Sequence, residues 1–362
     1  MISRRRFAAL PAAALVPPLA APALLAGGRV SAQALVRTSY GPTTTDISTG
    51  HAGHTSLPAT LGYWRNEGLD VNVFGIAGST MGVQLLSAGH VDFVGLSGED
   101  ILAARARGIP IRSVYLHARQ PISRIVVPAD SGITAIAQLR GKTLGVPVLG
   151  PDPYATGAFA EAGLDLEKDV TRVAVGTGAP ALLALRRGDV AGYLAWDTAV
   201  AGLEVRGMRF TEFRPSYYDE LFGLCVATRD EVVEKRPDLV VGMCRGIAEG
   251  VTFGMANPEA AIRIHWQAYP QSRPQGGDEA KLLQDAKHVF MSRFVLYALE
   301  PGARFGESRP AQWERVAGMM RAAGRLPADP DLAAAYTNRF VPAVNAFDAD
   351  AVRARAVRYP QP

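Results

Sequence analysis

Polar and small residues follow several predicted strands of this chain, where a small ligand could be held. Ser, Thr and Gly at the start of a helix either cap it or offer backbone N–H groups to a ligand, and both roles stay open here. Together these residues predict a polar pocket. The candidate ligand-binding residues are Thr49, His51, His54, Gly78, Ser79, Thr80, Ser97, Glu99, His117, Arg119, Leu149, Gly150, Tyr154, Thr177, Trp196 and Asp197.

Two of these candidate groups have alternative interpretations. His51 and His54 are three residues apart, which suits one helix face, but a third metal ligand is missing and Gly53 favours a loop. We therefore predict no metal site. The Trp196 indole could stack on a flat ligand while Asp197 accepts a hydrogen bond from it. Alternatively, Trp196 packs between domains and Asp197 caps the following helix.

The candidate side chains suit two kinds of ligand. His117 and Arg119 would bind a small anion or a carboxylate, and Trp196 and Tyr154 would bind an aromatic or heterocyclic ring. The sequence contains no G-x-S-x-G motif, no Walker phosphate loop and no CxxC, and its glycine spacing does not match a dinucleotide fingerprint. We predict neither a catalytic residue nor a cofactor.

One loop pattern occurs twice in the chain. The first copy contains Gly68-Leu69-Asp70, a Gly78-Ser79-Thr80 turn and Gly89-His90-Val91. The second contains Gly163-Leu164-Asp165, a Gly176-Thr177-Gly178 turn and Gly188-Asp189-Val190. Each copy reads as strand, glycine turn, short helix, glycine cap and strand. Two such units facing each other would enclose a ligand.

Strands and helices alternate along the first two thirds of the chain, which favours doubly wound α/β architecture. Residues 41–53 read as a polar loop. Strands are predicted at 111–116 and 123–128, and those at 210–213 and 223–228 are expected to return to the first half. Residues 238–323 read as mostly helical.

The N-terminus has the pattern of an export signal. Arg4-Arg5-Arg6-Phe7 precedes an apolar stretch and a small-residue cleavage site, Ala32-Gln33-Ala34. The paired arginines favour the twin-arginine route, and general secretion is the alternative. Cleavage would remove four arginines from a chain of formal charge +4, so the mature protein is about neutral and nucleic acid is not an expected partner. Cys225 and Cys244 could pair after export, although two buried thiols are favoured.

Several segments together resemble the periplasmic substrate-binding proteins of ABC importers in the sulfonate, taurine, nitrate and thiamine-precursor group. The resemblance spans about residues 35–229. It is carried by Gly62-Tyr63-Trp64-Arg65-Asn66-Glu67-Gly68-Leu69-Asp70-Val71, by Ser87-Ala88-Gly89-His90-Val91-Asp92-Phe93, by Ile125-Val126-Val127-Pro128-Ala129-Asp130-Ser131-Gly132-Ile133 and by Leu139-Arg140-Gly141-Lys142-Thr143-Leu144-Gly145-Val146.

This resemblance implies a two-lobed periplasmic binding protein fold, with two doubly wound sheets joined by two crossovers and extra C-terminal helices. Residues 1–34 would be the signal peptide, 35–121 and 218–362 the first lobe, and 122–217 the second. The expected function is capture of a small organic molecule between the lobes, by a periplasmic monomer, and delivery to an ABC permease at the inner membrane. The alternatives are a sensor subunit or an enzyme related to thiamine-pyrimidine synthesis. The cysteine-rich run of that enzyme branch is missing here.

Overall fold

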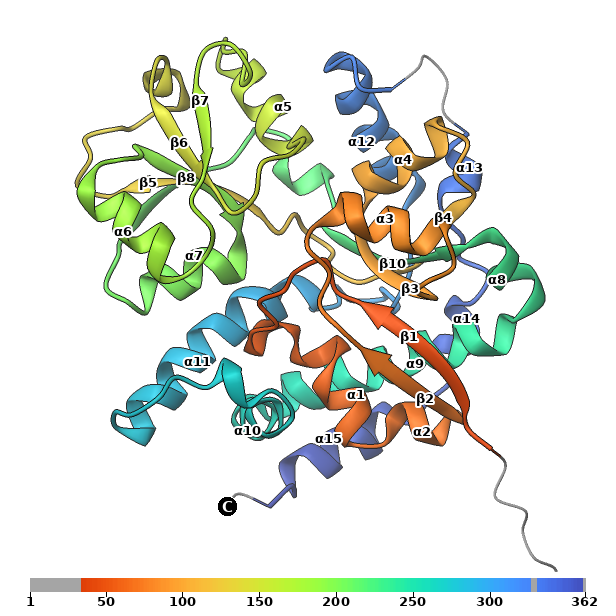
Figure 1. Ribbon diagram of the computed structural model, residues 1–362. Coiled ribbons are helices and arrows are strands. Elements are labelled where there is room, and N and C mark those ends of the chain that lie inside the picture. The colour runs from red at the N-terminus through yellow and green to blue at the C-terminus, as the bar shows by residue number, and fades with distance from the viewer. Residues whose placement is uncertain (1–33, 327–330, 361–362) are drawn as a thin grey trace, which may run out of the picture. The chain divides into compact units, whose positions relative to one another are not determined.

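The computed structural model describes residues 34–326 and 331–360, so all but the last residue of the predicted signal peptide, residues 1–34, lies outside the described residues. The described residues from Leu35 onward form one compact unit. This unit contains two five-stranded mixed sheets with flanking helices and several helices near the C-terminus (Figure 1). The predicted α/β class is therefore confirmed.

The first sheet has the strand order β2-β1-β3-β10-β4. β1 is parallel to β2 and β3, whereas β10 is antiparallel to its neighbours β3 and β4. The carboxyl ends of β1 to β4 consequently meet at one edge, where ligands bind in open α/β sheets. The strands are β1 (Val36–Gly41), β2 (Leu69–Val73), β3 (Phe93–Ser97), β4 (Ile111–Leu116) and β10 (Leu224–Arg229).

The second sheet repeats this pattern with the order β7-β6-β8-β5-β9. Phe210–Phe213, expected to return to the first half of the molecule, is instead the edge strand β9 of this sheet, because it pairs with β5 from Ile125 to Pro128. Only β10 enters the first sheet. The strands are β5 (Ser123–Pro128), β6 (Thr143–Val146), β7 (Thr171–Ala174), β8 (Gly192–Trp196) and β9 (Phe210–Phe213).

The repeated sequence pattern forms the same structural unit in both sheets. The first copy is β2, α3 (Ser79–Ser87) and β3, and the second is β7, α6 (Ala179–Arg187) and β8. The glycine that precedes each helix has a positive φ, 84° at Gly78 and 64° at Gly178. Such angles strain any residue with a Cβ, so the glycine turn is a backbone requirement in both units.

The remaining helices surround the two sheets. They are η1 (Thr49–His54), α1 (Ser56–Thr60), α2 (Tyr63–Asn66), α4 (Gly98–Ala106), η2 (Ile136–Leu139), α5 (Pro153–Glu161), α7 (Asp197–Glu204), η3 (Tyr218–Glu220), α8 (Asp230–Lys235), α9 (Pro237–Ala256), α10 (Pro258–Ala268), η4 (Pro270–Ser272), α11 (Glu279–Phe294), η5 (Val295–Tyr297), α12 (Pro310–Ala322), α13 (Leu332–Ala335), α14 (Val341–Val344) and α15 (Ala349–Val357).

One of these helices corrects a prediction. Residues 49–53, expected as the end of a polar loop, form the buried 3₁₀ helix η1 together with His54. Its small residues allow close packing: a Cβ added at Gly53 would lie 2.9 Å from Val251 Cγ2 and 3.0 Å from the Phe294 ring. The glycines that suggested a loop therefore serve to bring η1 against α9 and α11.

Two C-terminal helices each contact both halves of the molecule. α11 packs against η1 beside the first sheet and against α7 beside the second, and Figure 1 shows α11 and α7 side by side. α12 contacts α4 and α5 in the same way. The C-terminal helices α11 and α12 therefore connect the two sheets through their packing.

Helix α9 is long and apolar enough to span a membrane, but 72% of its most apolar window is buried inside the protein. Its buried residues, Phe253 among them, belong to the same hydrophobic core as Trp64 and Phe294. Cys244 on α9 and Cys225 on β10 are both buried and free.

A glycine-to-alanine substitution on α9, compared with a control substitution on α12, tests the packing between α9 and η1. A Cβ at Gly250 would lie 2.5 Å from the Gly53 carbonyl oxygen, so Gly250→Ala should lower the free energy of unfolding by about 1–3 kcal/mol. Gly318→Ala on α12 meets nothing within 4 Å and should raise it by roughly 0.4–1 kcal/mol. Urea unfolding measures both, and equal effects of the two changes would contradict the close approach.

Candidate functional site

Buried aromatic and histidine rings gather at the carboxyl edge of the first sheet. Tyr40 at the end of β1 forms a hydrogen bond of 2.7 Å between its hydroxyl oxygen and His54 Nδ1. The His54 ring lies 4.5 Å from that of His117, which follows β4, and 5.6 Å from that of His51. The structure therefore brings together His51, His54 and His117, all of which were predicted site residues.

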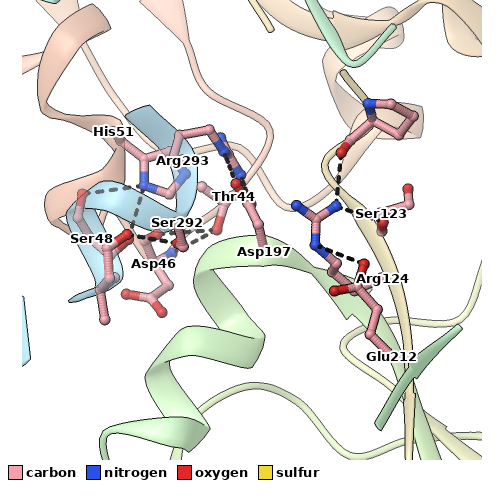
Figure 2. A network of polar contacts seen from close by, with 12 residues as sticks. Thr44, Asp46, Ser48, His51, Ser123, Arg124, Asp197, Glu212, Ser292 and Arg293 are labelled. Carbon is pink, nitrogen blue, oxygen red and sulfur yellow. Dashed lines mark hydrogen bonds and ion pairs between the residues drawn. The ribbon is translucent and has the colours of Figure 1, made fainter. Parts of the chain in front are cut away.

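A buried ion pair connects the carboxyl end of β8 in the second sheet to α11, which packs beside the first sheet. Asp197, directly after β8, accepts hydrogen bonds from Arg293 of α11, one of them 2.6 Å from Nε to Oδ2 and the other from Nη2 to Oδ1. Both side chains are only 1% exposed. Figure 2 shows the carboxylate and the guanidinium pointing toward each other.

Tyr297 joins this ion pair to the histidines. Its ring lies 4.0 Å from the His117 ring. Its hydroxyl lies near enough to Arg293 to raise the pKa of the guanidinium, although the geometry is not that of a hydrogen bond. We call the following seven residues the polar cluster: Tyr40, His51, His54, His117, Asp197, Arg293 and Tyr297.

Several polar atoms of this cluster are buried and find no hydrogen-bond partner within residues 34–326 and 331–360. We call them the open atoms: His54 Nε2, His117 Nδ1, His117 Nε2, Arg293 Nη1 and the Tyr297 hydroxyl oxygen. A buried polar group without a partner destabilises a protein by about 1–3 kcal/mol. Such a concentration of open atoms therefore marks a place where a ligand or ordered water completes the hydrogen bonding.

The cluster keeps its rings uncharged. Burial, and next the positive charge of Arg293, holds the pKa of His51 and of His117 well below its ordinary range. The pKa of His54 is lowered by burial and then by His117. Burial raises the pKa of Tyr40 and of Tyr297. Arg293 would lose its proton more readily through burial alone, but Asp197 reverses this and raises its pKa.

A second group of predicted residues lies at the starts of α3 and α4. Ser97 caps α4, where it accepts from the backbone N–H of Asp100 at 3.2 Å in a capping box. Burial raises the pKa of the neighbouring Glu99 to about 7, and the charges of Asp100 and then of Asp152 at the start of α5 contribute to the rise. Gly78 and Ser79 are half-buried and Thr80 is exposed.

The other predicted residues lie outside the polar cluster in their present positions. Arg119 donates from Nη1 to the Arg304 carbonyl oxygen at 3.3 Å and lines a surface pocket with Asp219 and Glu300. Leu149 and Gly150 are exposed, and Thr177 is half-buried. These four stay predictions as ligand residues.

Three further predicted residues have structural partners. Tyr154 is buried in the core beside Tyr218, with 6.4 Å between the ring centres. Thr49 donates to the Ala286 carbonyl oxygen of α11 at 3.2 Å. Trp196 is half-buried and packs against the core of the second sheet, next to Asp197.

Sequence reasoning missed Tyr40, Arg293 and Tyr297. A signal for the last two was present, because Phe290, Arg293, Phe294 and Tyr297 have the i, i+3, i+4, i+7 spacing of a single helix face. An arginine within an apolar helix face has to find a buried partner. Of the described residues, no group of three His, Cys, Asp or Glu side chains could hold a metal ion.

Comparison with known proteins identifies the family. The family model described as NMT1/THI5 like matches residues 51–261, which is more than half of the chain. The chain belongs to the NMT1/THI5-like family. The matched segment begins at His51 and includes every cluster residue from there to Asp197, whereas Tyr40, Arg293 and Tyr297 lie outside it.

Relatives of known name are of two kinds. The chain is 29% identical over 296 residues to the riboflavin-binding protein RibY of Chloroflexus aurantiacus, covering 79% of this chain and 81% of RibY. It is 26% identical over 275 residues to the formylaminopyrimidine-binding protein of Halalkalibacterium halodurans, covering 74% and 80%. It is also 26% identical over 309 residues to the Saccharomyces cerevisiae 4-amino-5-hydroxymethyl-2-methylpyrimidine phosphate synthase THI11, covering 79% and 82%.

Solved structures confirm the fold. The alkanesulfonate-binding protein SsuA from Xanthomonas axonopodis pv. citri has a TM-score of 0.63 at 15% identity, covering 83% of this chain and 98% of SsuA. The periplasmic nitrate-binding protein NrtA from Synechocystis PCC 6803 has a TM-score of 0.58 at 12% identity, covering 90% of each chain. The chain thus has the solute-binding protein fold of ABC import systems.

The raised pKa of Glu99 gives a pH-dependent prediction. Its folded-state pKa of about 7 exceeds the ordinary 4.5, so its neutral form stabilises the fold, and this stabilisation is lost as pH rises through about 7. Glu99→Gln stays neutral, so its melting temperature relative to wild type should increase between pH 5 and pH 8. Glu314→Gln, at an exposed position of α12, is the control and should follow wild type. A constant difference for Glu99→Gln would contradict the burial effect.

Proposed function

We propose that this protein is the extracytoplasmic solute-binding subunit of an ABC importer. It captures one small organic molecule between a first lobe, residues 35–121 and 218–362, and a second lobe, residues 122–217. The single observation that carries the proposal is the set of open atoms in the polar cluster. They lie where strand ends of both sheets meet through Asp197 and Arg293, which is where the closing lobes of a binding protein enclose their ligand.

The names of the relatives support this proposal. Two of them are named for binding a flavin or a pyrimidine, and the structural neighbours SsuA and NrtA are named as binding proteins of alkanesulfonates and nitrate. We propose a periplasmic, exported monomer that delivers its ligand to an ABC permease at the inner membrane. The connections at residues 117–122 and 214–223 would serve as the hinge.

An enzyme is the second candidate function, because THI11 is named as a synthase. A binding protein releases its ligand unchanged, whereas an enzyme converts it. Incubating the purified protein with each bound compound and analysing the mixture by mass spectrometry separates the two. A sensor subunit would also bind without turnover, but deletion of its gene would abolish a response and leave uptake intact.

Ligand binding should depend on the polar cluster. A thermal-shift screen of metabolites should find a compound that stabilises the protein, by about 2.7 kcal/mol at 100 times its Kd. His117→Asn removes a ring with two open atoms and should weaken that compound at least tenfold in isothermal titration. His90→Asn, at an exposed position, should leave the Kd unchanged. Wild-type affinity in His117→Asn would contradict a site at the polar cluster and would favour one at Trp196 and Thr177. The Trp196→Ala variant then tests that second position.

Export should remove the N-terminal segment. The arginine pair and Ala32-Gln33-Ala34 predict a mature protein that begins at Leu35. Mass spectrometry of protein recovered from the periplasm measures the N-terminus. Replacement of Arg4 and Arg5 by Lys should retain the protein in the cytoplasm if the twin-arginine route is used. A full-length product in the cytoplasm of wild-type cells would contradict the proposed location.

A further inference from the structure

The charges of the polar cluster cancel before any ligand arrives. Arg293 is its one cation among the described residues, and Asp197 accepts from both Nε and Nη2 of that guanidinium. Only Nη1 remains among the open atoms. Both side chains are 1% exposed, so solvent screens neither charge.

The other titratable groups around the ion pair do not alter this balance. His51, His54 and His117 have lowered pKa values and Tyr40 and Tyr297 have raised ones, with burial as the first cause in each case. Cys244 of α9 lies near enough to Tyr40, and His265 of α10 near enough to His51 and His54, to affect the pKa values of those rings. Burial raises the pKa of the Cys244 thiol and lowers that of the His265 imidazole to about 4. All these groups are neutral at pH 7.

We infer that Asp197 is a specificity-determining residue, which neutralises Arg293 so that the polar cluster selects an uncharged hydrogen-bonding ligand and rejects anions. This inference rests on the proposed function, since it names the ligand class of the same site.

The physical reason is the net charge of the loaded site. An anion beside Arg293 would share one buried positive charge with Asp197, which leaves a buried net negative charge and a large desolvation penalty. An uncharged ligand meets no such penalty. The open atoms also suit it, because a neutral imidazole offers one donor and one acceptor, a tyrosine hydroxyl offers both, and Nη1 donates. A heterocyclic amide or imide edge presents matching donors and acceptors.

The test compares the binding of molecules that have the same shape but different charge. It uses the whole mature chain, which begins at Leu35. The probes are benzamide with benzoate, and dimethyl sulfone with methanesulfonate. Wild type should bind each neutral member at least tenfold more tightly than its anion in isothermal titration at pH 7.5. Asp197→Asn leaves Arg293 without a counter-charge and should gain at least tenfold affinity for both anions.

A matched control separates the site from a general charge effect. Arg245 Nη1 donates to both carboxylate oxygens of Glu67, each at 2.9 Å, away from the polar cluster. Glu67→Gln should gain no anion affinity. The double variant D197N/R293Q contains no charge at the ion pair and should gain none either. Circular dichroism checks that each variant is folded. If Asp197→Asn does not fold, the preference of wild type for the neutral members still tests the inference.

The outcomes separate the two proposals. Wild type that does not prefer the neutral members, or a folded Asp197→Asn that gains no anion affinity, overturns the assignment of Asp197. If the metabolite screen yields no ligand for wild type while Asp197→Asn still gains anion affinity, the transport function is overturned and the neutralising role of Asp197 stands.

Discussion

The buried ion pair between Asp197 and Arg293 is the interaction on which the arrangement of this protein depends. Asp197 begins α7 beside the second sheet, and Arg293 lies on α11, which packs against η1 beside the first sheet. Removing one partner of such a pair leaves an unpaired buried charge, which destabilises proteins by about 3–5 kcal/mol. The pair thus fixes how the strand ends of the two sheets meet, and with them the histidine and tyrosine rings.

The positions of these rings follow from close backbone packing rather than from the rings themselves. η1 carries two histidines and lies against α9 and α11 because its residues are small: a Cβ at Gly50 would lie 2.5 Å from Thr198 Cγ2 and 3.2 Å from Arg293 Cβ. Larger residues would separate η1 from both α7 and α11. Tyr40 then holds His54 through the 2.7 Å contact between its hydroxyl and Nδ1.

Sequence reasoning reached the parts of the structure that depend on local patterns. The strands at Ile111–Leu116 and Ser123–Pro128 have the predicted bounds, because apolar runs ended by polar turns define them. His51, His54 and His117 were found because they lie near predicted strand ends. Arg293 was not, since its position depends on tertiary packing of a helix far along the chain. Phe210–Phe213 was assigned to the wrong sheet for the same reason, because strand pairing is nonlocal.

The place of β10 has a kinetic consequence for folding. This strand lies between β3 and β4 in the first sheet, yet the chain reaches it only after completing all five strands of the second sheet. Until then β3 and β4 have no partner on their facing edges, which invites pairing with other chains. The second sheet comes from one continuous segment, so it closes through shorter loops and is expected to form first. The half of the molecule that starts the chain is therefore the last to be finished.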